Sequence, residues 1–306
     1  MTSFQFQAIL QLLRSGPLPE TLSIADRRAG EEAMAGQSPL PENVYVEEVT
    51  AVTVPALLIA AEGTRDERVI LYLHGGGYCV GSPRTHRDFA WRLSAASAAR
   101  VLLPDYRRAP EHPFPTAVDD AVAAYRWLLV EGIDPAHLVI AGDSAGGGLA
   151  LAALVRLRDE GERLPAAAAL LSPWVDLALT GNSLQSKAAE DPVLSPAQLQ
   201  EFAELYLGDA DPRTPLASPL HADLAGLPPL LIQAGGAEIL LDDAVRLAER
   251  AEAAGVEVTL DVWPEMIHVW QGFAGFLPEG QTAVTKLGAF IRKHTAQAGL
   301  SPESPL

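Results

Sequence analysis

The chain has 306 residues, 48% hydrophobic and 20% charged, so it is long and apolar enough to bury a large core, and its composition excludes a disordered chain. Its 22 Lys and Arg residues stand against 39 Asp and Glu residues, and the resulting net charge of −17 disfavours binding to nucleic acid or to an anionic membrane surface. A single cysteine cannot form an internal disulfide, and no Cys or His spacing predicts a zinc site.

The N-terminal segment, residues 1 to about 40, precedes the first expected strand. Phe6, Ile9 and Leu13 recur there at helical spacing and predict one amphipathic helix. The segment has no basic region before its apolar residues, and the long uncharged run 224–237 contains prolines and glycines. We therefore expect no signal peptide, no membrane span and a cytoplasmic location.

The rest of the chain alternates short apolar segments with longer helical patterns. This alternation is typical of a mostly parallel sheet that is covered by helices on both faces. The expected strands are 43–50, 54–60, 69–73, 101–104, 138–141, 167–171, 230–234 and 257–262, and the expected helices are 84–97, 116–131, 145–160, 239–254 and 282–295. Gly161 and Gly255 follow two of these helices, where a chain often takes a left-handed conformation. The predicted fold class is α/β with about eight strands.

An inserted segment, 175–220, interrupts this alternation between the sixth and seventh expected strands. Ser195, Pro196 and Gln198 form the pattern of a helix N-terminus, which predicts a helix to about Leu207. An insert that carries its own helix is typical of a cap over a site. The predicted organisation is an N-terminal cap segment (1–40), a first part of the core (41–174), an inserted cap segment (175–220) and a second part of the core (221–306).

The strongest chemical signal is the sequence GDSAG at Gly142–Gly146, between an expected strand and an expected helix. Strand–turn–helix is the context that a G-x-S-x-G nucleophile needs. The hydroxyl of Ser144 would then stand at a helix N-terminus, where backbone N–H groups and the helix dipole favour negative charge. The alternative is a glycine-rich turn without chemistry, and the context favours the nucleophile.

A second signal is HGGG at His74–Gly77, directly after the expected strand 69–73. Glycines let a backbone approach a ligand closely and point successive N–H groups at one spot. The alternatives are a loop that needs positive φ and a phosphate cradle, but the Lys-Ser/Thr pair of a P-loop does not follow. A loop of this kind before a nucleophile elbow matches the oxyanion donors of lipases and esterases.

Three motifs together identify a resemblance. HGGG at 74–77, DYRRAPEHPFP at 105–115 and GDSAGG at 142–147 resemble the hormone-sensitive-lipase-like (bacterial family IV) esterases of the α/β-hydrolase fold. The motifs stand in the family's order and at its intervals, and the likeness covers nearly the whole chain. The resemblance implies small, fairly short-chain acyl esters as substrates, pockets formed by the cap segments, and no cofactor or metal.

The resemblance also implies roles for individual residues. The N–H groups of Gly76, Gly77 and Ala145 would bind the oxyanion, whereas 105–115 would be structural. His268 stands after the last expected strand, where the family places its general base. The family commonly has Gly-Phe after this histidine, and the Val-Trp found here would reshape the acyl or alcohol pocket.

The acid is the member of the triad that departs from the family pattern. The usual sequence is Asp-Pro-Leu-x-Asp, whose first Asp orients the histidine, and this chain has EILLD at Glu238–Asp242. Glu238 occupies the matching position, and we predict that it is the acid. Asp242 is the alternative acid, and Asp242 and Asp243 could instead be helix-start residues that interact with the helix dipole.

The predicted activity is hydrolysis of carboxylic esters through an acyl-enzyme on Ser144, with His268 as base and Glu238 as acid. The same triad could serve an amidase, a lactonase or an arylformamidase, because a fold does not fix its substrate. A small-molecule receptor without turnover is a further alternative, which the presence of both Ser144 and His268 disfavours. The expected partner is a small ester, and a homodimer is left open.

Overall fold

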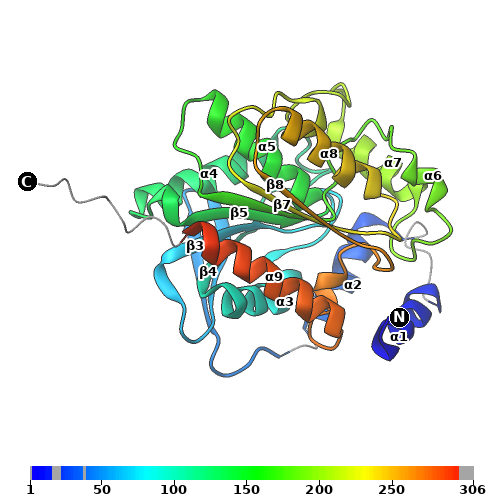
Figure 1. Cartoon of the computed structure of the whole chain (residues 1–306), viewed down its shortest axis with the longest axis horizontal. Helices are drawn as coiled ribbons and strands as arrows, with labels where there is room; N and C mark the ends of the chain where they lie inside the picture. The colour runs from blue at the N-terminus through cyan, green and yellow to red at the C-terminus, as the bar shows by residue number, and fades with distance from the viewer. Residues whose placement is uncertain (1, 16–21, 37–38, 296–306) are drawn as a thin grey trace, which may run out of the picture.

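The computed structural model describes residues 2–15, 22–36 and 39–295. Its centre is an eight-stranded sheet in the order β1-β2-β4-β3-β5-β6-β7-β8 (Figure 1). The strands are β1 (Tyr45–Ala51), β2 (Val54–Ala60), β3 (Arg65–Leu73), β4 (Ala99–Pro104), β5 (Leu138–Asp143), β6 (Ala167–Leu171), β7 (Leu230–Gly235) and β8 (Val258–Trp263). Strand β2 pairs antiparallel with β1 and β4, and every other pair is parallel. The expected α/β fold is confirmed.

The central strands are continuously apolar because helices cover both of their faces. Every residue of β5, β6 and β7 is buried, whereas the edge strand β8 is only partly covered. Strand β3 begins at Arg65, earlier than the expected 69, and the register of its pairing with β4 shifts between Arg65 and Val69. The added residues are polar, so the apolar pattern did not predict them.

Two groups of helices cover the sheet. On one face lie α4 (Thr116–Val130), α5 (Ala145–Asp159) and α8 (Leu241–Ala253), and on the other lie α3 (Pro83–Ser97) and α9 (Pro278–Thr295) (Figure 1). These are the five helices that the sequence predicts, although α9 begins at Pro278 rather than at 282. Gly161 and Gly255 have φ values of +74° and +81°, as expected for residues that end helices.

The N-terminal and inserted segments supply the other helices. The described residues before β1 form two helices, α1 (Phe4–Ser15) and α2 (Ile24–Ala35), so the prediction of a single helix there was wrong. The inserted segment carries α6 (Ser183–Ser186) and the expected α7 (Pro196–Leu207), and the side chain of Ser195 accepts the N–H of Gln198 as a helix cap. The described residues also include the short 3-10 helices η2 (Pro135–His137), η3 (Pro219–His221) and η4 (Trp270–Phe273).

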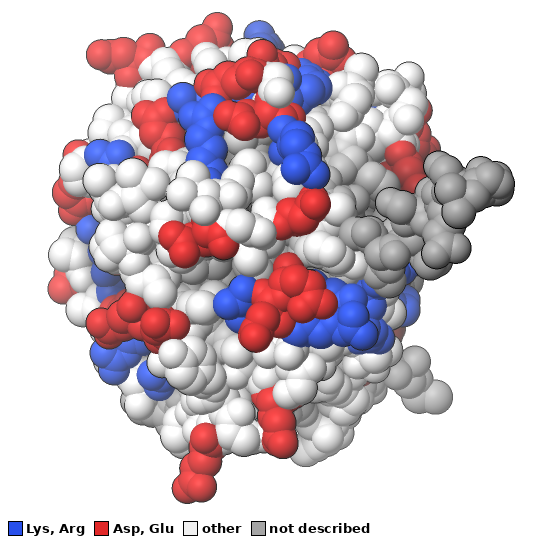
Figure 2. Space-filling model, turned by 90° about the vertical axis from the view of Figure 1, so that its left-hand side faces the viewer, with Lys and Arg blue, Asp and Glu red and all other residues white. Residues whose placement is uncertain are grey.

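Helices α1, α2, α6 and α7 gather at one end of the sheet, on the right in Figure 1. On the face shown in Figure 2, acidic and basic side chains are interspersed, so neither sign of charge forms a continuous patch there. Within the described parts of the chain, the helices lack the combination of length and hydrophobicity that a membrane crossing requires.

Candidate active site

Ser144 forms the turn between β5 and α5. Its φ of +53° and ψ of −123° lie in a region that L-residues rarely adopt, and such strain costs roughly 1–3 kcal/mol. The neighbouring glycines permit it: a Cβ on Gly142 would lie 2.3 Å from the carbonyl oxygen of Gly146, and a Cβ on Gly146 would lie 2.0 Å from that of Leu73. The expected strand–turn–helix context of the serine is present, at the N-terminus of α5.

The glycine loop after β3 lies beside this turn. Gly76 and Gly77 have φ values of +114° and +59°, which favour glycine, and a Cβ on Gly77 would lie 2.1 Å from the ring of Phe202. The N–H of Gly75 donates to the carboxylate of Asp143 at 3.0 Å. The residue before Ser144 thus fixes the start of the loop that is predicted to bind the oxyanion.

Asp143 has further partners that the sequence did not predict. Its Oδ1 accepts the hydroxyl of Tyr72 at 2.8 Å and lies 3.4 Å from Nε2 of His86. Burial by itself would raise the pKa of Asp143, but the charge and hydrogen bonds of His86 and Tyr72 outweigh burial and lower it. A carboxylate inside the G-x-S-x-G motif was the available signal for this network.

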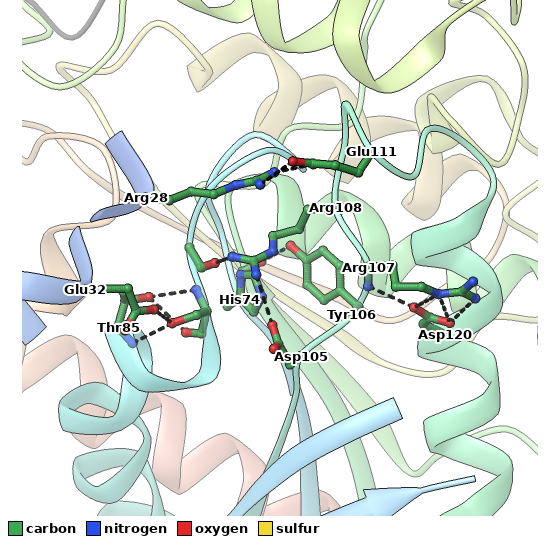
Figure 3. A network of polar contacts seen from close by, with 12 residues as sticks. Arg28, Glu32, His74, Thr85, Asp105, Tyr106, Arg107, Arg108, Glu111 and Asp120 are labelled. Atoms are coloured by element: carbon green, nitrogen blue, oxygen red, sulfur yellow. Dashed lines mark hydrogen bonds and ion pairs between the residues drawn. The ribbon is translucent and has the colours of Figure 1, made fainter. Parts of the chain in front are cut away.

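The stretch 105–115 packs against His74, the first residue of the glycine loop (Figure 3). The hydroxyl of Tyr106 donates to the carbonyl oxygen of His74 at 2.7 Å, and the two rings stack with their centroids 4.2 Å apart. Arg107 pairs with the buried carboxylate of Asp120 at 2.7 Å, which ties the stretch to α4. These contacts agree with the structural role that the resemblance implies.

Arg28 attaches α2 to the same region. Its guanidinium donates to the carbonyl oxygens of Cys79 and Ala109, both at 2.7 Å, and pairs with Glu111 at 2.8 Å (Figure 3). Bidentate contacts of this kind fix the direction of the arginine as well as its position. The N-terminal segment is therefore attached directly to the loop that follows β3.

His268 follows β8 and faces the predicted acid. Its Nδ1 lies 3.4 Å from Oε2 of Glu238, and both side chains are buried, 5% and 0% exposed. Burial lowers the pKa of the imidazole, but the carboxylates of Glu238, Asp191 and Asp143 outweigh burial and raise it. The distance exceeds that of a tight hydrogen bond, as is common for catalytic pairs without substrate.

Ser172, directly after β6, connects the loops of this pair. Its hydroxyl donates to Oε2 of Glu238 at 2.7 Å and accepts the N–H of Val269 at 3.2 Å. Ser172 is fully buried and has a φ of +46°. Sequence analysis did not identify it, and the one available signal was a hydroxyl residue at the carboxyl end of a buried central strand.

Asp242, the alternative acid, and its neighbour Asp243 lie elsewhere. Asp242, in the first turn of α8, accepts the N–H groups of Asn182 at 2.6 Å and Ser183 at 3.1 Å. Asp243 accepts two N–H groups at the start of the inserted segment, and burial raises its pKa to about 8. Both carboxylates bind main chain, whereas the carboxylate beside His268 is that of Glu238.

A cavity of about 630 Å³ is lined by both Ser144 and His268. Its lining also includes Leu13 and Met34 from the N-terminal helices. The inserted segment adds Val193, Leu194, Leu199 and Phe202, so most of the wall around the serine is apolar. Both expected cap segments therefore contribute to one cavity.

Among the residues that the structure describes, no three His, Cys, Asp or Glu side chains are grouped so that they could hold a metal ion.

Comparison with known proteins agrees with this geometry. A family model described as the alpha/beta hydrolase fold matches residues 70–272. The chain is 54% identical over 233 residues to an acetyl-hydrolase of Streptomyces hygroscopicus, covering 76% of this chain and 78% of that protein.

Solved structures extend the likeness over nearly the full length. An esterase from the bacterial hormone-sensitive lipase family superimposes with a TM-score of 0.93 at 49% identity, covering 96% of this chain and 99% of that one. The esterase EstE5, in crystals soaked with p-nitrophenyl butyrate, has a TM-score of 0.93 at 46% identity with the same coverage. The chain therefore belongs to the α/β-hydrolase family, as a carboxylic ester hydrolase of the bacterial hormone-sensitive lipase group.

Proposed function

We propose that the protein hydrolyses short-chain acyl esters through an acyl-enzyme on Ser144, with His268 as general base and Glu238 as the orienting acid. The observation that carries the proposal is the placement of Nδ1 of His268 3.4 Å from the buried carboxylate of Glu238, in a cavity that Ser144 also lines. Nucleophile, acid and base follow one another along the chain in the order typical of α/β-hydrolases.

In the first half of the reaction, the hydroxyl of Ser144 attacks the ester carbonyl and His268 takes the hydroxyl proton. Glu238 keeps the remaining imidazole proton on Nδ1, so that Nε2 is free to accept, and stabilises the imidazolium that forms. Gly76, Gly77 and Ala145 donate their N–H groups to the oxyanion. These donors are held in place before substrate arrives, which is usually the largest part of such catalysis.

The imidazolium of His268 then gives its proton to the leaving alcohol, which ends the first half of the reaction and leaves the acyl group on Ser144. Water then enters, His268 removes a proton from it, and the oxyanion forms again at the same N–H groups. Collapse of this intermediate releases the carboxylic acid and returns the proton to Ser144. Water is the second reactant, and no step requires a cofactor.

The cavity and the relatives favour short-chain acyl esters as substrates. Residues of both expected cap segments contribute to the apolar wall of the cavity, and its volume is about 630 Å³. EstE5, which is similar to this chain, was soaked with a butyrate ester, and another relative is named an acetyl-hydrolase. We expect activity to peak at acyl groups of four to six carbons, as the family resemblance implies. A series of p-nitrophenyl esters, with amide and lactone controls, measures this preference.

Ser144→Ala tests the proposal. Loss of the nucleophile in a triad costs on the order of 10⁶-fold in kcat, while the fold should be kept because alanine is smaller than serine. A fluorophosphonate should label Ser144 in the unmodified protein and leave the variant unlabelled. Activity within tenfold of the unmodified protein, in a preparation free of it, would remove Ser144 from the mechanism.

Location and assembly belong to the same proposal. We expect a cytoplasmic protein and allow for a homodimer. Fractionation of the producing cells measures the first, and sedimentation equilibrium measures the second. Neither result alters the chemistry proposed for Ser144.

A further inference from the structure

The residue after the proposed acid is held by both of its main-chain groups. The N–H of Ile239 donates to Oδ2 of Asp191 at 2.9 Å, and its carbonyl oxygen accepts the hydroxyl of Ser183 at 2.7 Å. Asp191 and Ser183 are 9% and 3% exposed, and Ile239 is fully buried. Both partners belong to the inserted segment, which the sequence suggests only as a cover over the cavity.

Asp191 connects this point to the cavity wall. Its second oxygen, Oδ1, accepts the N–H groups of Val193 at 2.8 Å and Leu194 at 3.1 Å, and both of these residues line the cavity. One carboxylate therefore accepts three main-chain donors from two separate loops. An asparagine would have one acceptor oxygen, and its amide group would face an N–H on the other side.

Ser183 makes the second connection. Besides donating to Ile239, its hydroxyl accepts the N–H of Asp242 at 3.0 Å. The carboxylate of Asp242 in turn accepts the N–H groups of Asn182 and Ser183. These contacts attach the short helix α6 to the start of α8.

The side chain of Glu238 has a separate attachment. Ser172, outside the inserted segment, donates to its carboxylate at 2.7 Å, and no backbone atom of Glu238 takes part in that contact. The inserted segment fixes the main chain of the acid's loop, and Ser172 fixes the carboxylate. Displacement of a catalytic group by about 1 Å can cost about 10²-fold in rate, so both attachments bear on catalysis.

We propose that Asp191 and Ser183 are positioning residues for the acid: the inserted segment holds Glu238 against His268 as well as covering the substrate. The proposal rests on the proposed function, in which Glu238 is the acid. Because Asp191 also holds Val193 and Leu194, the wall that contacts substrate and the loop that carries the acid move as one unit.

A double-mutant cycle tests this inference. Asp191→Asn is made in the unmodified protein and in Glu238→Gln, and kcat is measured with p-nitrophenyl butyrate. A residue that acts through Glu238 loses its effect once Glu238 is replaced. In the unmodified protein we expect Asp191→Asn to lower kcat about 10²-fold. In Glu238→Gln, where no orienting carboxylate remains, we expect it to lower kcat less than about threefold.

Asp211→Asn is the matched control. Asp211 lies in the same inserted segment and accepts the N–H of Arg213 at 2.8 Å in a similar turn, but it is exposed and does not contact the loop of Glu238. We expect its kcat to stay within about twofold, as is usual for surface substitutions. Circular dichroism checks that every variant is folded, and Ser183→Ala in the same two backgrounds replaces Asp191→Asn if that variant does not fold.

The outcomes separate the inference from the proposed function. Equal losses of kcat in both backgrounds, or unchanged kcat in the unmodified background, would overturn the positioning role. An active Glu238→Gln would instead overturn the assignment of the acid, and the inference with it. Loss of kcat confined to the background with Glu238 supports the inference, whereas a direct effect of the Asp191 charge on His268 would lower kcat in both backgrounds.

Discussion

Glu238→Gln is the substitution whose effect the contacts define best. In the unmodified protein Oε2 accepts from Ser172 and faces Nδ1 of His268, whereas Oε1 has no hydrogen-bond partner among the described residues. A glutamine places its NH₂ at the Oε2 position, because the hydroxyl of Ser172 and Nδ1 of His268 can both accept there, while the other position offers the NH₂ no acceptor.

This orientation selects the wrong tautomer of the base. With an NH₂ opposite Nδ1, the imidazole proton moves to Nε2, which then cannot accept the proton of Ser144, and the imidazolium also loses its counter-charge. Comparable substitutions in serine hydrolases cost about 10⁴-fold in kcat. Initial rates with p-nitrophenyl butyrate at the pH optimum measure the loss, and circular dichroism confirms the fold.

Asp242→Asn is the control for this prediction. Asp242 binds the N–H groups of Asn182 and Ser183 through one oxygen, which an asparagine can also supply. We expect most of kcat to remain and stability to fall by about 1 kcal/mol, since the charge at the start of α8 is lost. If Asp242→Asn is inactive and Glu238→Gln is not, the assignment of the triad is wrong.

Other predictions follow from the same site. His268 must be neutral to act as base and its pKa is raised, so kcat/KM should rise with pH through a value above 6.5, and this limb should move to lower pH in Glu238→Gln; an unmoved limb would contradict the pairing. Gly77→Ala should lower kcat at least about tenfold, since its Cβ would lie 2.1 Å from the ring of Phe202 and distort the oxyanion loop; unchanged kinetics would place the oxyanion elsewhere. Ser172→Ala should lower kcat about 10- to 100-fold with little change in KM, because the carboxylate of Glu238 is released; a change in KM alone would contradict this role. EDTA should leave activity unchanged, and inhibition that zinc reverses would indicate a metal enzyme.

The sequence predicted the turn at Ser144 and the glycine loop, because each depends on residues that are neighbours in the chain. The turn at Ser144 needs Gly142 and Gly146 within two residues, and the loop before it needs consecutive glycines, so a short motif contains the whole requirement. Glu238 and His268 were assigned from their places in the family pattern rather than from a local requirement. Their placement side by side depends on the adjacent pairing of β7 and β8, which the structure provides.

The contacts that the sequence did not predict join distant segments. Ser172 and Glu238 are 66 residues apart, and Asp191 and Ile239 are 48 residues apart, so nothing in the local sequence of either partner indicates the other. Helix α2 was missed for another reason: its one buried side chain is that of Arg27, so it has no apolar stripe at helical spacing. Polar contacts hold this helix, and hydrophobic periodicity does not report them.

Backbone hydrogen bonds also join the loops that carry the proposed catalytic residues. The N–H of Ser144 donates to Leu171, that of Ser172 to Gln233 and that of Gly236 to Trp263, so the hydrogen bonding of the sheet continues past the ends of β5, β6 and β7.

Glycine makes the last of these connections possible, because a Cβ on Gly236 would lie 2.3 Å from the carbonyl oxygen of Pro264. Backbone contacts of this kind do not depend on which side chains line the cavity. We therefore expect substitutions of Leu13 and Met34 to change which ester is bound and to leave the proposed catalytic residues in place. A substitution of Asp191 should affect catalysis as well. Its carboxylate joins Val193 in the cavity wall to Ile239, the residue after Glu238, and these two segments depend on that side chain for the connection.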